Sequence, residues 1–296
     1  MQINQVNIGI IGGGNLGRSV AEGFLKAGIE PSKICITRRR VHLLEDLRTK
    51  GVSIEKENAK GVAGREVVVL AVKPYQAIEL LRELKPHLKP GQILLSLMTG
   101  ISLAELNENV PEGVLTFRVM PNTAVALQES MTLIAAPDCD PAIQKLVGDL
   151  FETLGKVIFI NEELMAAATV LGACGIAFAL RFIRAAIQGG VEIGFGADVA
   201  QQIVAQTVKG ATELILQTGR HPEQEIDKVT TPKGITISGL NEMEHQGFSS
   251  ALIRGLLVSF NKLNNASSTT LGDRVSSSNS PSTSLGDRSQ LSTLNS

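Results

Sequence analysis

A glycine-rich segment near the N-terminus has the spacing most directly associated with a chemical role. It reads Gly12-Gly13-Gly14-Asn15-Leu16-Gly17, follows the apolar, strand-like run 6–11 and opens a helix-like stretch. In that context Gly12 permits a tight turn, Gly14 lets the backbone approach a diphosphate, and Gly17 allows close helix–strand packing. Free N–H groups at the helix start would then hold the diphosphate of a dinucleotide. The alternative is a glycine-rich turn that binds nothing.

The residues at the end of the next apolar run, 34–37, indicate which dinucleotide is bound. The run continues as Thr37-Arg38-Arg39-Arg40, and no acidic residue lies between Glu30 and Glu45. An NAD site places a carboxylate here for the ribose 2′-hydroxyl, whereas a hydroxyl and guanidinium groups suit a 2′-phosphate. We therefore predict NADP(H), and we expect one or two of the arginines to lie at the surface without a ligand.

A second candidate site lies in the segment 227–237. Threonine, proline and glycine are crowded there into a loop that leads to a helix expected to begin near Thr236. Free N–H groups at that helix start would hold a carboxylate. The Thr236 hydroxyl can contact a substrate or cap its own helix, and the spacing alone favours neither role.

The sequence lacks the patterns of other catalytic chemistries. The four histidines and three cysteines are scattered, without the spacing of a metal site or a disulfide framework, and no Gly-x-Ser-x-Gly motif occurs. We expect no metal. Hydride transfer from a nicotinamide needs none, because it requires only a positioned donor and an electrophile.

The net charge and the N-terminal sequence limit the class of protein to which the chain can belong. The chain has 296 residues, with 28 basic and 29 acidic side chains and a formal net charge of -1, so it lacks the basic excess of nucleic-acid-binding proteins. No signal-peptide pattern precedes the glycine-rich segment. We expect a cytoplasmic enzyme with a small-molecule substrate and with neither a nucleic-acid nor a membrane partner.

Alternating strand-like and helix-like segments over residues 1–160 must position the dinucleotide. The run 67–72 is apolar throughout, as in a strand that is buried on both faces of a parallel sheet. The alternation predicts βαβ units, and therefore an α/β domain of the Rossmann type with a parallel sheet. The expected strands are 6–11, 34–37, 67–72, 93–97, 114–120, 132–135 and 157–160, and the expected helices are 15–27, 41–49, 76–85 and 141–154.

Residues 161–264 are predicted to form an all-α second domain. The uncharged stretch 164–180 is just short of a membrane span, and its small residues, followed by Arg181 and Arg184, favour a buried helix. We expect one helix to end at Gly219 and another over 240–263. The first has an apolar face made of Ala200, Ile203, Val204, Val208, Ala211, Leu214 and Ile215. Because this domain has too little chain to cover such faces, we expect it to oligomerise.

The last 32 residues, 265–296, contain 15 serines and threonines and no aromatic residue. Such a segment buries too little apolar surface to offset its ordering entropy. We predict a disordered tail without a function, and the repeated Leu-Gly-Asp-Arg as a binding motif is the alternative.

Four motifs occur in a characteristic order along the chain. They are the glycine turn, Ala71-Val72-Lys73-Pro74, the stretch 118–123 (Arg-Val-Met-Pro-Asn-Thr) and 229–232 (Val-Thr-Thr-Pro) followed by Gly234 and Thr236. Together these motifs resemble the pyrroline-5-carboxylate reductase family over roughly residues 6–263. The resemblance implies reduction of the cyclic imine to L-proline with NADPH, or with NADH as an alternative donor. It also implies a Rossmann domain and an α-helical dimerisation domain, with homodimers that in some members build decamers.

The resemblance also implies roles for individual residues. Thr236 would be catalytic, beside the imine nitrogen, and Gly234, Ile235 and Thr236 would bind the substrate carboxylate. The cofactor would contact Ile11, Gly12, Gly13, Gly14, Asn15, Leu16, Thr37, Arg38, Asn58, Ala71, Val72, Lys73 and Pro74.

The chain departs from the family pattern in two places. Lys233 stands where the family usually has glycine, and 172–178 (Gly-Ala-Cys-Gly-Ile-Ala-Phe) replaces Ser-Gly-x-Gly-Pro-Ala-Tyr. The alternatives are a hydroxyacid dehydrogenase of similar build, disfavoured because 161–181 holds no lysine, and a non-catalytic NADP-sensing protein.

Overall fold

An eight-stranded sheet forms the core of the N-terminal half. The computed structural model describes residues 3–277, with side chains up to residue 265. The strand order is β3-β2-β1-β4-β5-β6-β7-β8. Their bounds are β1 Ile8–Ile11, β2 Ile34–Thr37, β3 Ser53–Glu55, β4 Val67–Leu70, β5 Ile93–Ser96, β6 Leu115–Met120, β7 Ser130–Ala135 and β8 Gly155–Phe159. The α/β fold class is confirmed.

The sheet differs from the prediction at two strands. β3 has only three residues, two of them polar, so no apolar run marks it in the sequence. β7 is antiparallel to β6, with Arg118 opposite Ala135 and Met120 opposite Leu133. The two strands are joined by a short link that contains a single 3₁₀ turn, Thr123–Leu127, and such a link is too short for the crossover that parallel strands require. The sheet is therefore parallel except at this pair.

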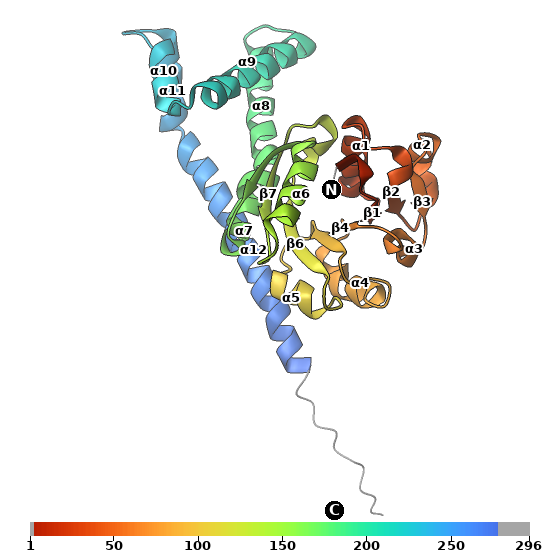
Figure 1. The fold of residues 1–296 in the computed structure, drawn as a ribbon. Coiled ribbons are helices and arrows are strands. Elements are labelled where there is room, and N and C mark those ends of the chain that lie inside the picture. The colour runs from red at the N-terminus through yellow and green to blue at the C-terminus, as the bar shows by residue number, and fades with distance from the viewer. Residues whose placement is uncertain (1–2, 278–296) are drawn as a thin grey trace, which may run out of the picture.

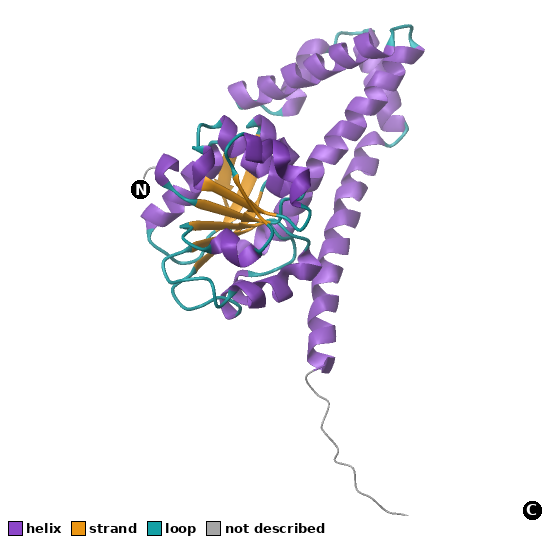
Figure 2. Cartoon of the chain, turned by 90° about the vertical axis from the view of Figure 1, so that its right-hand side faces the viewer, coloured by secondary structure: helices purple, strands orange, loops and turns teal. Residues whose placement is uncertain are grey.

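Helices cover both faces of the sheet because successive strand residues point to opposite faces. Ile8 and Ile10 belong to one core cluster with Phe24 and Phe151, whereas Ile11 belongs to the other. The helices of this domain are α1 Asn15–Lys26, α2 Glu45–Thr49, α3 Asn58–Val62, α4 Ala77–Leu84, α5 Leu103–Glu108 and α6 Pro141–Glu152. The two faces and their helices are visible in Figure 2.

The C-terminal half is a helical arm that projects from this domain (Figure 1). It contains α7 Met165–Ala168, a π-helical turn Thr169–Cys174, α8 Gly175–Glu192, α9 Ala197–Thr218, α10 Pro222–Val229, α11 Ile235–His245 and α12 Phe248–Ser277. Gly219, at φ 65°, ends α9 as expected. Gly247, at φ 78°, separates α11 from α12, so the single helix expected over 240–263 is wrong.

The end of the chain also differs from the prediction. α12 continues to Ser277, whereas the disordered tail was expected to begin at residue 265. The rest of that predicted tail, 278–296, lies outside the described residues, so its disorder stays a prediction.

The apolar residues of the arm are exposed in the single chain. The helical stretch Glu162–Glu192 is long and apolar enough to cross a membrane by length and composition, and only 17% of its apolar window is buried. The expected buried helix over residues 164–180 is therefore found only in part, because Met165, Ala168, Thr169 and Val170 are buried whereas Leu164 and Leu171 are exposed. Leu180 is 57% exposed and Ile193 is 78% exposed. Exposed apolar surface on this scale indicates an interaction surface.

Candidate functional site

The glycine turn follows β1 and opens α1, as its spacing predicts. Gly12 has φ 107°, and a Cβ atom there would lie 2.7 Å from the carbonyl oxygen of Ala71. A Cβ on Gly17 would lie 2.1 Å from the carbonyl oxygen of Gly12. Real Cβ atoms do not approach backbone oxygens so closely, so packing within the protein explains why glycine stands at positions 12 and 17.

Gly14 has no such explanation within the chain. A Cβ atom at this position would meet no heavy atom of residues 3–277 within 4 Å, apart from its chain neighbours. Its φ of -74° suits any residue, and it is the N-cap of α1 without a side-chain cap. The first turn of α1 holds no acidic residue. The helix start therefore presents free N–H groups at an open surface, which fits a diphosphate.

Thr37 holds the glycine turn from the end of β2. Its carbonyl accepts the Gly13 N–H at 2.6 Å, and its hydroxyl accepts the Gly12 N–H at 3.3 Å. The same hydroxyl donates to the Asn58 Oδ1 at 2.8 Å, and the Asn58 amide donates in turn to Glu83 at 3.3 Å. Thr37 is 1% exposed. Its hydroxyl supports the turn from inside, and a contact with a 2′-phosphate stays a prediction.

Arg38 contacts the turn, and within the described part of the chain no salt bridge joins its guanidinium to a carboxylate. Its guanidinium donates to the Gly13 carbonyl at 2.6 Å, which is a neutral acceptor. Arg18, by contrast, pairs with Asp46 and with Glu22, and these carboxylates raise the pKa of Arg18. Arg38 thus keeps a positive charge at the turn that a phosphate can use.

The segment after β4 forms the other wall of the turn. The Ala71 N–H donates to the Ile11 carbonyl at 2.8 Å, and the Val72 side chain lies 2.8 Å from where a Gly12 Cβ would be. Lys73 and Pro74 are exposed at the same edge of the sheet. The structure therefore brings 11–16, Thr37, Arg38, Asn58 and 71–74 together around one turn, although they are far apart in the sequence.

The loop 230–234 joins α10 to α11. The Gly234 N–H donates to the Thr231 carbonyl at 2.9 Å, and Gly234 is the N-cap of α11. Lys233 has φ 59°, a left-handed conformation that costs about 1–2 kcal/mol for a residue with a side chain. Thr236 is the second residue of α11 and is exposed. Thr236 is therefore not the N-cap of its helix, and its contact with a substrate stays a prediction.

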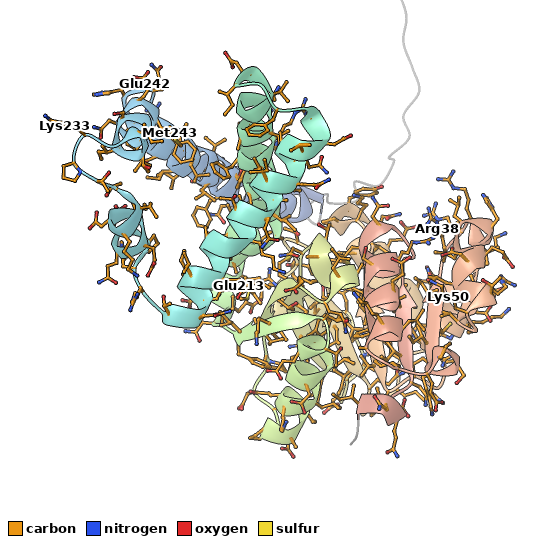
Figure 3. The ribbon with its side chains drawn as sticks, turned by 90° about the horizontal axis from the view of Figure 1, so that it is seen from above. Arg38, Lys50, Glu213, Lys233, Glu242 and Met243 are labelled. Carbon is orange, nitrogen blue, oxygen red and sulfur yellow. The ribbon has the colours of Figure 1, made fainter. Side chains whose placement is uncertain are left out.

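A single chain does not bring the two sites together. In Figure 3 Lys233 and Arg38 lie at opposite ends of the molecule, with the arm between them. Figure 1 agrees, because α10 and α11 lie beyond α9 on the side away from α1 and β2.

Comparisons with known proteins cover both halves. Residues 162–265 match the model of the pyrroline-5-carboxylate reductase dimerisation family, and residues 7–100 match that of the coenzyme F420-dependent NADP oxidoreductases. Pyrroline-5-carboxylate reductase 2 of Dictyostelium discoideum is 39% identical over 90% of this chain and 98% of that protein. The chain belongs to the pyrroline-5-carboxylate reductase family. Another relative, pyrroline-5-carboxylate reductase 1 of the same organism, is 39% identical over 88% of this chain, and the match covers half (50%) of that protein's length.

Solved pyrroline-5-carboxylate reductases share the fold. The Plasmodium falciparum enzyme with NADP bound superposes with a TM-score of 0.80 at 25% identity, over 88% of this chain and 98% of that one. The Coxiella burnetii enzyme gives a TM-score of 0.79 at 27% identity, over 88% of this chain and 98% of that one.

Three polar residues of this family member escaped the sequence analysis as site candidates. Arg118 on β6 pairs with Glu162 at 2.9 Å, and the same carboxylate accepts the Leu103 N–H at 2.7 Å. Asn122 donates to the Gly172 carbonyl at 3.3 Å. These contacts join the sheet to the start of the arm. They span 44 to 59 positions, so no local pattern reveals them.

Proposed function

We propose that the protein reduces pyrroline-5-carboxylate to L-proline, with NADPH as the preferred donor and NADH as an alternative. Family membership, together with the open Gly14 side of the turn and the cationic Arg38 beside it, carries this proposal. NADPH, when bound, supplies the hydride for the imine carbon. One proton on the ring nitrogen completes the secondary amine, and no metal is required.

The cofactor residues stay those named from the sequence. The backbone of 11–16 would hold the diphosphate, Arg38 the 2′-phosphate, and Asn58 the adenosine side, with Thr37 fixing the turn. Residues 71–74 would contact the nicotinamide side. The fit rests on the open space around a Gly14 Cβ, since no heavy atom of the described residues beyond its chain neighbours lies within 4 Å of it.

The substrate would bind at the start of α11. The Ile235 N–H would hold its carboxylate beside Gly234, whose own N–H is already bonded to the Thr231 carbonyl, and the Thr236 hydroxyl would hydrogen-bond the ring nitrogen. α11 carries no side-chain cap and has no acidic residue in its first turn, so an anion would meet no repulsion from that turn.

A second copy of the chain would complete each active site. The arm carries the substrate loop away from its own cofactor turn, and its apolar helices are exposed (Figure 3). Arg181 and Arg184 are exposed inside the long apolar stretch, where a lipid would have to accommodate two charges. We therefore propose a homodimer formed through the arms, and decamers built from such dimers as a further step. Light scattering of the purified protein distinguishes these states.

The cellular site is proposed to be the cytoplasm. Cys35, Cys139 and Cys174 are free thiols, and burial raises the pKa of the Cys35 thiol. Such a set of unpaired thiols fits a reducing compartment.

The decisive assay follows NADPH absorbance on addition of pyrroline-5-carboxylate and identifies proline as the product. Oxidation that requires the imine supports the proposal. Oxidation with hydroxyacids or their keto forms instead would indicate a dehydrogenase, and NADPH binding without turnover would indicate a sensing protein.

Arg38→Ala is expected to raise the KM for NADPH by about 10- to 100-fold, because one charge-assisted contact contributes about 1.5–3 kcal/mol. The KM for NADH should rise less, since only the loss of the Gly13 contact affects both cofactors. Arg39→Ala, at an exposed neighbour, is the matched control. Equal effects of Arg38→Ala on both cofactors would remove the 2′-phosphate role.

Gly14→Ala and Gly17→Ala are expected to have opposite signatures. Gly14→Ala should change the free energy of unfolding by less than about 1 kcal/mol, because the new Cβ meets no protein atom, yet weaken NADPH binding by about tenfold or more. Gly17→Ala should destabilise the fold by about 3 kcal/mol, because its Cβ overlaps a backbone oxygen. Thermal melting and NADPH titration test the pair, and normal NADPH affinity in Gly14→Ala would contradict the diphosphate site.

A further inference from the structure

A π-helical turn lies where the arm leaves the sheet. Residues Thr169–Cys174 form this turn inside the otherwise continuous helical stretch 162–192. A π turn is rare, because it interrupts the regular hydrogen bonds of the α-helix, and it is found frequently at functional sites. Here it directly precedes Gly175–Phe178, part of the segment that departs from the family pattern.

The turn is packed firmly on its sheet side. Met165 and Ala168 belong to one apolar cluster with Met120 and Leu133, and Thr169 is 6% exposed. The Thr169 hydroxyl donates back to the Met165 carbonyl at 2.7 Å, a contact that bends helices. The Met165–Thr169 side is therefore anchored, and the position of α8 depends on the turn that follows.

Asn122 reaches this turn from the loop after β6. Its Oδ1 accepts the Ala124 N–H at 3.0 Å, which caps the 3₁₀ turn Thr123–Leu127. That contact settles which way the amide points, so the Nδ2 group must face the arm. There it donates to the carbonyl of Gly172 at 3.3 Å. The side chain of Asn122 thus forms hydrogen bonds both to the sheet domain and to the π turn.

The register of the turn decides what α8 presents. Each residue of an α-helix turns by about 100°, so one residue more or less in the turn would rotate Ile176 and Phe178 by that angle relative to the sheet. A side-chain donor to the Gly172 carbonyl favours the π form, because a π turn interrupts the regular pairing of helix carbonyls.

Asn122 follows β6 at the same carboxyl edge of the parallel strands as the glycine turn, which is the edge where such sheets bind their ligands. We propose that Asn122 is a positioning residue that holds the π turn, and through it orients the start of α8 for the imine substrate. This role rests on the proposed function. It predicts that losing the Asn122–Gly172 bond damages substrate binding and turnover, and leaves NADPH affinity unchanged.

Asn122→Asp and Asn122→Ser test the role. Both keep an oxygen that can accept the Ala124 N–H, but Asp has no donor for the Gly172 carbonyl and Ser is too short to reach it. We expect kcat/KM for pyrroline-5-carboxylate to fall by about 10- to 100-fold, as for a misplaced site, with an unchanged Kd for NADPH. Hydrogen exchange of peptides covering 169–178 should accelerate about fivefold.

Asp140→Ala is the matched control. Asp140 caps α6 by accepting the Ala142 N–H at 2.8 Å and is exposed, so this variant loses a cap elsewhere. It should lower the melting temperature and leave kcat/KM unchanged.

Kinetics and hydrogen exchange together distinguish a positioning role of Asn122 from that of a structural cap. Asn122 variants that match Asp140→Ala, with wild-type kcat/KM, would reduce Asn122 to a structural cap and overturn the proposal. So would unchanged exchange over 169–178. A wild-type protein that binds NADPH but does not reduce the imine would overturn the proposed function, and the positioning role with it, whatever the exchange result.

Discussion

Replacing Thr236 with alanine is expected to lower kcat and kcat/KM together, by about 10- to 1,000-fold. The iminium nitrogen loses its positive charge as hydride arrives, and a hydroxyl that hydrogen-bonds this nitrogen stabilises the transition state without a strong base. Thr236 is the second residue of α11, and the cap position belongs to Gly234. The variant therefore removes no helix cap, and alanine is the better helix former at this position. Activity should be lost without a loss of stability.

Steady-state kinetics and a melting curve check this prediction. Thr49→Ala is the matched control, because Thr49 is an exposed threonine whose hydroxyl donates to the Asp46 carbonyl at 2.8 Å. That change should leave both kcat and KM unaltered. Wild-type kcat in Thr236→Ala would show that Thr236 is not a catalytic residue. Backbone N–H groups would then be the only substrate contacts proposed at this loop.

Leu180→Asp is expected to convert the proposed dimer to folded, inactive monomers. Leu180 lies on α8 and is 57% exposed in the single chain, so the new carboxylate should not disturb folding. It lines a groove between α8 and α9 with Ile183 and Ile187. Arg184 lines the same groove one helical turn away and can pair with the new carboxylate, but a second copy in that groove would lose its contact with leucine and would have to bury this ion pair. The change should therefore weaken the dimer by about 1.5–3 kcal/mol, or roughly 10- to 100-fold in Kd. Val208 is half-buried, so changing it would confound folding with assembly.

Light scattering and kinetics over a range of protein concentrations measure this effect. Leu127→Asp changes a leucine that is 67% exposed on the sheet domain and should leave the mass unchanged. An active Leu180→Asp protein of unchanged mass would refute the interface.

Mixing two impaired variants, assayed at an NADPH concentration that the Gly14→Ala turn does not fill, tests the sharing of the active site directly. Thr236→Ala chains have an intact cofactor turn, and Gly14→Ala chains have an intact substrate loop. If each site combines the turn of one chain with the loop of the other, mixed dimers contain one intact site and regain activity. If each site belongs to one chain, mixing restores nothing.

Local features of the fold follow from the sequence alone. The glycine turn is predictable because φ 107° at Gly12 and the close approach at Gly17 admit no side chain. The buried strands are predictable because a short run that is apolar throughout, such as 67–72, is typical of a strand whose two faces are both buried in a parallel sheet. The end of α9 at Gly219 follows from the left-handed conformation that glycine adopts without cost. Each of these depends on a few neighbouring residues.

Tertiary structure decided the features that depend on distant parts of the chain. The antiparallel pairing of β6 with β7 depends on the length of the link between them, and the bonds of Thr37 to Gly12 and Asn58 join three separate elements. The bond from Asn122 to Gly172 spans 50 positions. Sequence patterns also predicted that residues 164–180 would be buried, whereas only the part next to the sheet, 165–170, is packed and Leu171 and Leu180 are exposed. Apolar periodicity indicates only that one face of a helix must be covered. Which part of this chain or of another chain covers it depends on where the arm lies relative to the sheet domain.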